Sequence, residues 1–242
     1  ATARTLAQAG CFLVLAARTR EPLDTLAAEL NAGPTQAVAI PTNMGDTAQA
    51  ANLVRATVET FGRLDVVINN AALGVRDEVV DLNETEARRV MDVNYFGPVA
   101  LIQAAIPHLK ANREGGLIIN ISSIVGRRAM PGIAGYCASK AALEKMAESL
   151  RIELKRDNIR VSTVYPGVTA TRFNDHSLGR SQSGRGRLAG VPPERAAQTI
   201  LRTIRHERRD VFVTLFDRAF VTAGALWPWL MDQLLSRYTG RS

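Results

Sequence analysis

Tyr136 and Lys140, which stand four residues apart, are the side chains in this sequence best suited to moving a proton. A spacing of four places both on one face of a helix, one turn apart. A free phenol has a pKa of roughly 10, too high for efficient proton exchange at neutral pH. A fixed ammonium at about 4 Å favours the phenolate by roughly 4 kcal/mol at an effective dielectric of about 20, before the cost of burial. The pair therefore predicts a phenol whose pKa is brought near working pH, although ordinary surface pairs share this spacing.

Two polar residues upstream favour a site over a surface pair. Ser123 follows a strand-like run and precedes the tyrosine helix, so its hydroxyl is expected at the ligand-binding edge of a sheet. There it can donate a hydrogen bond to a substrate oxygen. Asn94 falls inside a stretch of helical period, where asparagine has no propensity advantage. Such an asparagine bonds to local backbone unless a polar network needs it.

Five motifs in a fixed order make the chain resemble the short-chain dehydrogenase/reductase family over nearly its whole length. They are Asn69-Asn70-Ala71-Ala72, Asn94, Ser123, Tyr136-x-x-x-Lys140 and the run Tyr-Pro-Gly-Val-Thr-Ala-Thr at residues 165–171. The resemblance implies that Tyr136 is the general acid in carbonyl reduction and the base in alcohol oxidation. It implies that Lys140 lowers the pKa of that phenol and binds the nicotinamide ribose. Ser123 would polarise the substrate oxygen, and Asn94 would hold a water that links Lys140 to solvent.

The resemblance also implies a nicotinamide cofactor, with Tyr136 and Lys140 among its contacts. Asn70 would line the adenosine side, and Asn43 with Met44 occupies the position of the family's adenine clamp. The nicotinamide pocket and its carboxamide contacts would come from Pro166, Gly167, Thr169 and Thr171. A structural alternative stays open, in which Asn70 satisfies strand-end backbone groups and Pro166-Gly167 is only a turn.

The residues after the first strand-like run favour NADP over NAD. NAD-selective sites place a carboxylate on the adenosine ribose here, whereas NADP sites place a cation near the 2′-phosphate. Ala17 stands where NAD-using members tend to carry Asp, and Arg18 follows it. We therefore expect Arg18 to meet the 2′-phosphate of NADP.

The elements that must position these residues alternate between strand and helix. Short apolar runs rich in β-branched residues occur at residues 11–16, 36–40, 66–68, 117–121, 161–164 and 211–215. Helical stretches lie at residues 21–31, 47–61, 84–112, 133–156 and 192–206, with a kink or break expected at Pro107. This order predicts an α/β fold with a doubly wound, Rossmann-like parallel sheet in three α/β/α layers and a single domain over residues 1–242.

The composition of the chain limits the classes of partner that it is expected to bind. The chain has 242 residues and a formal net charge of +7, but the basic residues are dispersed among acids and show no nucleic-acid-binding motif. Cys11 and Cys137 form no disulfide or metal-ligand pattern, so we expect no metal and a cytoplasmic location.

Three segments carry their own expectations. The chain begins inside what looks like a helix, so the family's first strand and its Thr-Gly-x-x-x-Gly-x-Gly turn, roughly 15 to 20 residues, are expected to precede Ala1. Residues 173–190 are expected to form a polar substrate lid. Residues 216–242 are expected to form a helical tail carrying Trp227 and Trp229. Core or subunit packing is favoured for those rings over a pocket wall or membrane contact.

These observations predict an NADP(H)-dependent oxidoreductase that reduces a ketone or aldehyde, or oxidises the matching alcohol. The alternative is a non-catalytic cofactor-sensing or scaffold protein on the same fold; the complete set of four catalytic residues argues against it. The family usually assembles through the helices at residues 84–112 and 133–156, so a homodimer or homotetramer is expected by resemblance.

Overall fold

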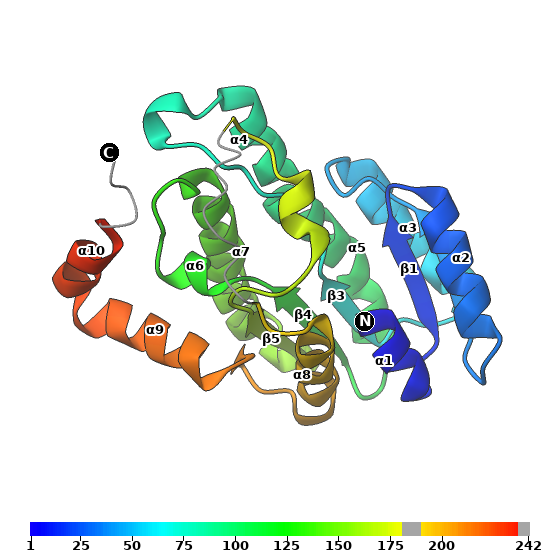
Figure 1. The fold of residues 1–242 in the computed structure, drawn as a ribbon. Coiled ribbons are helices and arrows are strands. Elements are labelled where there is room, and N and C mark those ends of the chain that lie inside the picture. Colours follow the sequence, from blue (N-terminus) through cyan, green and yellow to red (C-terminus); the bar gives the residue numbers. More distant parts are fainter. Residues whose placement is uncertain (181–189, 237–242) are drawn as a thin grey trace.

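The computed structural model describes residues 1–180 and 190–236. Strands and helices alternate along the chain (Figure 1). The strands are β1 (Leu13–Ala17), β2 (Ala37–Pro41), β3 (Val66–Asn69), β4 (Gly116–Ile121), β5 (Ile159–Tyr165) and β6 (Asp210–Phe212). The α-helices are α1 (Thr2–Gln8), α2 (Arg20–Asn31), α3 (Thr47–Phe61), α4 (Glu84–Met91), α5 (Gly97–Ala111), α6 (Ile124–Arg127), α7 (Ala134–Glu153), α8 (Pro193–His206), α9 (Leu215–Leu226) and α10 (Pro228–Ser236). Short turns of other helix types are η1 (Val79–Asp81), η2 (Asp92–Phe96), η3 (Lys155–Asp157) and η4 (Arg172–His176).

All strand pairs are parallel, and helices cover both faces of the four-stranded sheet. Ile118 of β4 packs with residues of α3, α5 and α7, whereas its neighbours Leu117 and Ile119 pack with Ile200 of α8 on the opposite face. Such alternation within one apolar run is what burial on both faces requires. The predicted α/β fold with a parallel sheet and three layers is confirmed.

The parallel strands form two sheets, where one continuous sheet was expected. β1 pairs with β2, while β3, β4, β5 and β6 pair in that order. Within the described part of the chain, no strand joins β1 to β3. Both strands therefore end their sheets with an unpaired edge.

The helical stretch at residues 84–112 is interrupted at a different place from the one expected. α5 continues through Pro107 to Ala111, so the break predicted at this proline is wrong. The proline removes one helical hydrogen bond, the one its N–H would donate to the Gln103 carbonyl in the preceding turn, and α5 keeps its helical path despite this loss. The interruption is the π-helical turn η2, which contains Asn94. Single π-helical turns inside helices are frequent at functional sites.

The end of the chain also departs from the predicted pattern. The run at residues 211–215 is a strand only as far as Phe212, because Thr214 and Asp217 form a capping box that begins α9. Helices α9 and α10 occupy the tail and lie at the opposite side of the molecule from β1 and α2 (Figure 1). Residues 237–242 lie outside the described residues. Trp227 and Trp229 are 52% and 62% exposed, so packing in the core of this chain is not their role.

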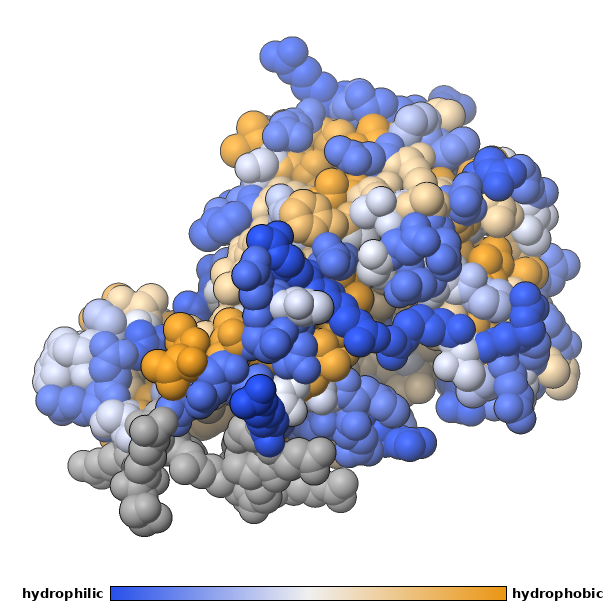
Figure 2. Space-filling model, turned by 90° about the horizontal axis from the view of Figure 1, so that it is seen from above, coloured by the Kyte–Doolittle hydropathy of each residue, from blue (hydrophilic) through white to orange (hydrophobic). Residues whose placement is uncertain are grey.

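The surface is of mixed character. On the face shown in Figure 2, hydrophobic residues lie in separate groups between hydrophilic ones. Among the described residues, no helix combines the length and apolar character needed to cross a membrane.

We predict that Gly97→Ala destabilises the fold by about 1–3 kcal/mol. An ideal Cβ at Gly97 would lie 1.9 Å from the carbonyl oxygen of Met44, so helix α5 and the chain after β2 must move apart. Gly33→Ala is the matched control, since its Cβ meets only the Leu30 carbonyl at 3.5 Å. Urea unfolding measures both variants; equal free energies of unfolding for Gly97→Ala and the unaltered protein would contradict the prediction.

Candidate active site

The predicted catalytic residues meet at the carboxyl edge of the four-stranded sheet. Strand β4 ends at Ile121, two residues before Ser123, and β5 ends at Tyr165, next to Pro166. Helix α7 carries Tyr136 and Lys140 past this edge. Because parallel strands all end on the same side, residues distant in the sequence are brought together here.

Ser123 is the first contact point. Its backbone caps α6, and its Oγ accepts a hydrogen bond from the Val125 N–H at 3.3 Å. The same hydroxyl donates to the Pro166 carbonyl at 3.3 Å. It also lies close enough to the Tyr136 phenol to lower the pKa of that group. Ser123 and Tyr136 therefore lie beside each other in the structure.

Lys140 is anchored under the phenol. Its side chain is almost fully buried, and Nζ donates a hydrogen bond to the Ile121 carbonyl at 2.8 Å. Nζ lies 5.9 Å from the centroid of the Tyr136 ring. Burial lowers the pKa of Lys140 from 10.5 to about 8, so the amine is still mainly protonated at neutral pH. The two side chains therefore share one face of α7, as their spacing predicted.

The pKa expected for Tyr136 is wrong for this arrangement. Burial raises the pKa of the phenol above its ordinary value, and the contact with Ser123 offsets only part of the rise. Desolvation disfavours the phenolate, and Lys140 is not among the groups that lower the pKa of Tyr136; its ammonium is directed at the Ile121 carbonyl. In this arrangement Tyr136 is a proton donor, the form needed for carbonyl reduction.

Asn94 connects three segments of the site. Its Oδ1 accepts from the Leu73 N–H at 2.7 Å, and its Nδ2 donates to the Leu73 carbonyl at 2.8 Å and to Ser139 Oγ at 2.9 Å. Both side-chain N–H groups are thus occupied. The side chain therefore has no N–H left to donate to a relay water. The side chain itself braces the segment after β3 against α7.

Phe173 was not among the predicted site residues. Its ring lies 5.5 Å from the Tyr136 ring, in a tilted arrangement. The described part of the predicted lid docks on the segment after β3: Leu178 N–H donates to the Gly74 carbonyl, and Arg76 N–H donates to the Leu178 carbonyl. The feature of the sequence that could have indicated this role is an aromatic residue, Phe173, at the start of a mainly polar loop. The rest of the lid, residues 181–189, lies outside the described residues.

The proposed nicotinamide-side residues form a short connected segment after β5. The Pro166 carbonyl accepts from Ile124 N–H as well as from Ser123. A Cβ at Gly167 would lie 2.1 Å from an Asp217 oxygen, so only glycine fits there. Thr169 Oγ1 donates to the Gly167 carbonyl at 3.4 Å, and Thr171 caps η4. These contacts show that residues 166–171 form an ordered turn. Such a turn is also what the alternative expects, in which Pro166-Gly167 has no role in cofactor binding.

The proposed adenosine-side residues follow β1, β2 and β3. Arg18, Asn43 and Asn70 are exposed, and Arg18 has no ion-pair partner within the described ranges. Asn43 Oδ1 accepts from the Gly45 N–H at 3.1 Å, while Met44 packs against the main core. Exposed amides and a free guanidinium at the ends of parallel strands fit a ligand with a base, a ribose and a phosphate. The residues present therefore fit the two ends of a dinucleotide.

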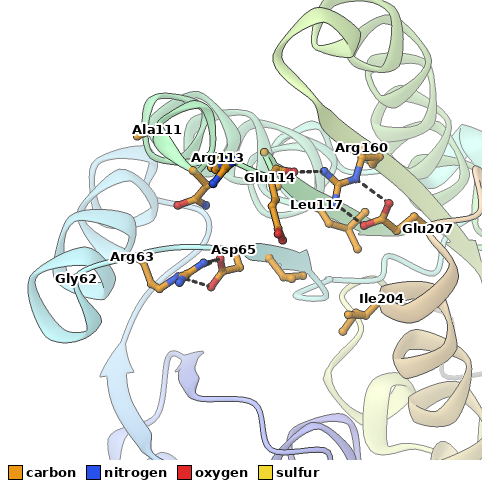
Figure 3. A pocket seen from close by; sticks show the side chains of 14 residues that line it. Gly62, Arg63, Asp65, Ala111, Arg113, Glu114, Leu117, Arg160, Ile204 and Glu207 are labelled. Atoms are coloured by element: carbon orange, nitrogen blue, oxygen red, sulfur yellow. Dashed lines mark hydrogen bonds and ion pairs between the residues drawn. The ribbon is translucent and has the colours of Figure 1, made fainter.

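A separate hollow of about 710 Å³ lies at the opposite edge, where β3 and β4 begin (Figure 3). Its walls carry the ion pairs Arg63–Asp65 and Arg160–Glu207. It holds none of the predicted catalytic residues. Among the described residues, no three His, Cys, Asp or Glu side chains gather as a metal site would require.

Comparison with known proteins finds relatives over nearly the whole chain. A family model described as short chain dehydrogenase matches residues 1–180. An uncharacterized oxidoreductase of Bacillus subtilis, YxnA, is 32% identical over 240 residues, which cover 98% of this chain and 67% of that protein. The chain thus spans about two thirds of that relative.

Solved structures share the fold. An alcohol dehydrogenase from the archaeon Thermococcus sibiricus, complexed with 5-hydroxy-NADP, matches with a TM-score of 0.76 and 27% identity over 87% of this chain and 88% of that chain. A short chain dehydrogenase/reductase from Burkholderia phymatum in complex with NAD matches with a TM-score of 0.86 over 95% of this chain and 89% of that chain; at 22% identity this shows the fold alone.

We predict that the free energy of unfolding of the unaltered protein rises between about pH 8 and 10.5, and that Lys140→Met abolishes this rise. The folded pKa of Lys140 is about 8 and its ordinary value is 10.5, so between these values the unfolded chain binds more protons. The free energy of unfolding of the unaltered protein should therefore rise relative to that of Lys140→Met, by on the order of 1–3 kcal/mol, as pH rises through this window.

Urea unfolding at the two ends of the window measures this difference. Lys145→Met is the control, since that lysine is 72% exposed on the same helix. A pH dependence that is the same in the unaltered protein and in Lys140→Met would show that the lysine is not desolvated.

Proposed function

The chain belongs to the short chain dehydrogenase family of NAD(P)-dependent oxidoreductases, and we propose that it uses NADP(H) to reduce a ketone or aldehyde, or to oxidise the matching alcohol. The observation that carries this proposal is the meeting of Ser123, Tyr136 and Lys140 at one sheet edge. The nicotinamide supplies the hydride in reduction and accepts it in oxidation. The protein's residues have to bind the oxygen and move one proton.

In reduction, the Ser123 hydroxyl would turn its single hydrogen from the Pro166 carbonyl to the substrate oxygen, and Tyr136 would donate a second hydrogen bond to it; both polarise the C=O bond. As hydride adds to the carbon, the Tyr136 O–H bond breaks and its proton goes to the oxygen, which leaves a phenolate. The Lys140 ammonium, mainly protonated at neutral pH, stabilises that phenolate. A proton from solvent then restores the phenol. Oxidation runs through the same steps in reverse.

Asn94 would hold the relay water through its backbone, because both N–H groups of its side chain already donate within the brace. The brace fixes Ser139, one residue before Lys140, and so contributes to the placement of the lysine. This assigns Asn94 a positioning role beside the proton relay.

The choice of NADP rests on Arg18. Its exposed guanidinium follows β1, where a 2′-phosphate would lie, and no carboxylate stands at Ala17. The two solved structures compared above hold different cofactors, one a derivative of NADP and the other NAD, so they do not decide the choice.

We further propose that a parallel strand and its glycine-rich turn fill the gap between β1 and β3 in the natural protein. Strands β1 and β3 each have one edge without a strand partner among the described residues. The sequence of residues 1–242 contains no Thr-Gly-x-x-x-Gly-x-Gly turn of the kind that holds a pyrophosphate in this family.

The substrate is proposed to be rather apolar, since the Phe173 ring lies beside the reacting phenol. A homodimer or homotetramer through α5 and α7 is supported by the exposed apolar side chain of Ile152 on α7, which is 79% exposed. Trp227 and Trp229, both more than half exposed, are proposed to pack between subunits. The two free cysteines agree with a cytoplasmic location.

We predict that Tyr136→Phe abolishes turnover while the fold is kept. The variant loses the transferable proton but retains the ring and its packing against Phe173. NADPH oxidation with a panel of aldehydes and ketones measures the loss, which should be at least on the order of 100-fold in kcat. Tyr95→Phe is the matched control, because that ring packs on Phe96. Equal rates for Tyr136→Phe and the unaltered enzyme would remove Tyr136 from the mechanism.

We predict that Arg18→Ala raises the KM for NADPH by on the order of tenfold and leaves the KM for NADH nearly unchanged. The lost guanidinium would have paired with the 2′-phosphate, which NADH lacks. Arg55→Ala, on the exposed side of α3, is the control. A parallel change in both KM values would count against the assigned phosphate contact.

A further inference from the structure

A charged cluster that the proposed mechanism does not use joins four elements behind the active site. Arg127, the last residue of α6, pairs through Nε with Glu144 of α7 at 2.5 Å. Its NH2 group donates to the Tyr165 hydroxyl of β5 at 2.6 Å and lies 3.4 Å from Asp210 of β6. The guanidinium also stacks over the Tyr165 ring, 4.7 Å from its centroid. One arginine therefore ties α6 to α7, β5 and β6.

Helix α6 depends on such anchoring. It has four residues, and a single helical turn is unstable without tertiary contacts. Ser123 caps its first end, and Arg127 holds its last. The side chain of Glu144 is only 3% exposed, so its charge has to be met by the guanidinium.

The cluster lies on the face of α7 that carries the catalytic pair. Tyr136, Lys140 and Glu144 follow one another at a spacing of four. Gly126 lets α6 lie directly on this face, since a Cβ there would come within 3.1 Å of the Lys140 backbone. The tie from Arg127 to Glu144 thus fixes α6 one turn beyond Lys140.

We infer that Arg127, held by Glu144, is a positioning residue for Ser123. The fork of the guanidinium sets the orientation of α6 and thereby the direction in which the Ser123 hydroxyl faces the phenol. This role rests on the proposed function of Ser123 and Tyr136. From the sequence alone, Arg127 is expected to be only a surface charge.

The test is a double-mutant cycle in the full-length enzyme, with NADPH and benzaldehyde as probe. Arg127→Lys keeps the charge opposite Glu144 but loses the fork. Alone it should lower kcat on the order of tenfold, with the KM for NADPH unchanged. In a Ser123→Ala background the same change should have almost no further effect, because the group it positions is already gone.

The matched control is Arg160→Lys, on the same strand as Tyr165. Arg160 makes a fork to Glu207 at the far end of β5, and this substitution should leave kcat unchanged in both backgrounds. Equal losses for Arg127→Lys with and without Ser123 would overturn the positioning role. Tyr136→Phe reports separately on the proposed function, so failure of one does not imply failure of the other.

A crystal structure of the Glu144→Gln variant tests the positioning role of Arg127 without a measurement of activity. Displacement of α6 with loss of the bond from Ser123 to the Pro166 carbonyl would support the inference. An unmoved α6 with Ser123 in place would overturn it.

Discussion

The buried ammonium of Lys140 is the constraint on which the site depends. A charged amine in the interior needs an acceptor, and here the acceptor is the Ile121 carbonyl at the end of β4. That bond fixes α7 against the strand whose continuation carries Ser123. On the same helix, Ser139 receives the Asn94 amide. Burial thus destabilises the charged form of Lys140. The bond that meets this charge also aligns the Ser123 hydroxyl, the Tyr136 phenol and the Lys140 ammonium.

The π-helical turn at Asp92–Phe96 interrupts the regular helix and in return places the Asn94 side chain against the segment after β3. A regular helix through this segment would carry on from α4 into α5 without interruption, whereas η2 accommodates an asparagine that bonds away from its own helix. The Leu73 backbone is satisfied on both its N–H and C=O groups by this one side chain. The segment that follows β3 is therefore held by side-chain bonds in place of a strand ladder, and the lid docks on the residue next to it.

Patterns in the sequence predicted the bounds of helices and strands and the spacing of residues along one helix. They did not predict properties that depend on burial or on contacts between distant elements. Apolar runs and helical periods located five of the strands and α3 closely, and the spacing of Tyr136 and Lys140 placed them on one face. The raised pKa of Tyr136 did not follow from spacing, because it comes from desolvation by residues distant in the chain. The ties of Arg127 to Glu144, Tyr165 and Asp210 were equally hidden, since each partner comes from a different element. Thr214 ended the last predicted strand early through a cap that apolar periodicity does not register.

The split between β1 and β3 separates the residues proposed to bind the adenosine end of the cofactor from the proposed catalytic residues. Arg18 and Asn43 follow β1 and β2, while Ser123 and Pro166 follow β4 and β5. In the described chain the halves are joined by helix packing: Val14 and Ile40 of the two-stranded sheet contact the core that contains α3 and α5, and α1 packs on α8. Helix packing tolerates small sliding motions that a hydrogen-bonded ladder does not. Hydride transfer needs the cofactor placed to within a fraction of an ångström of the Tyr136 site. A strand in the gap would couple the adenosine end to the proton donor through one continuous sheet, so its contribution to catalysis would come through alignment as well as through phosphate binding.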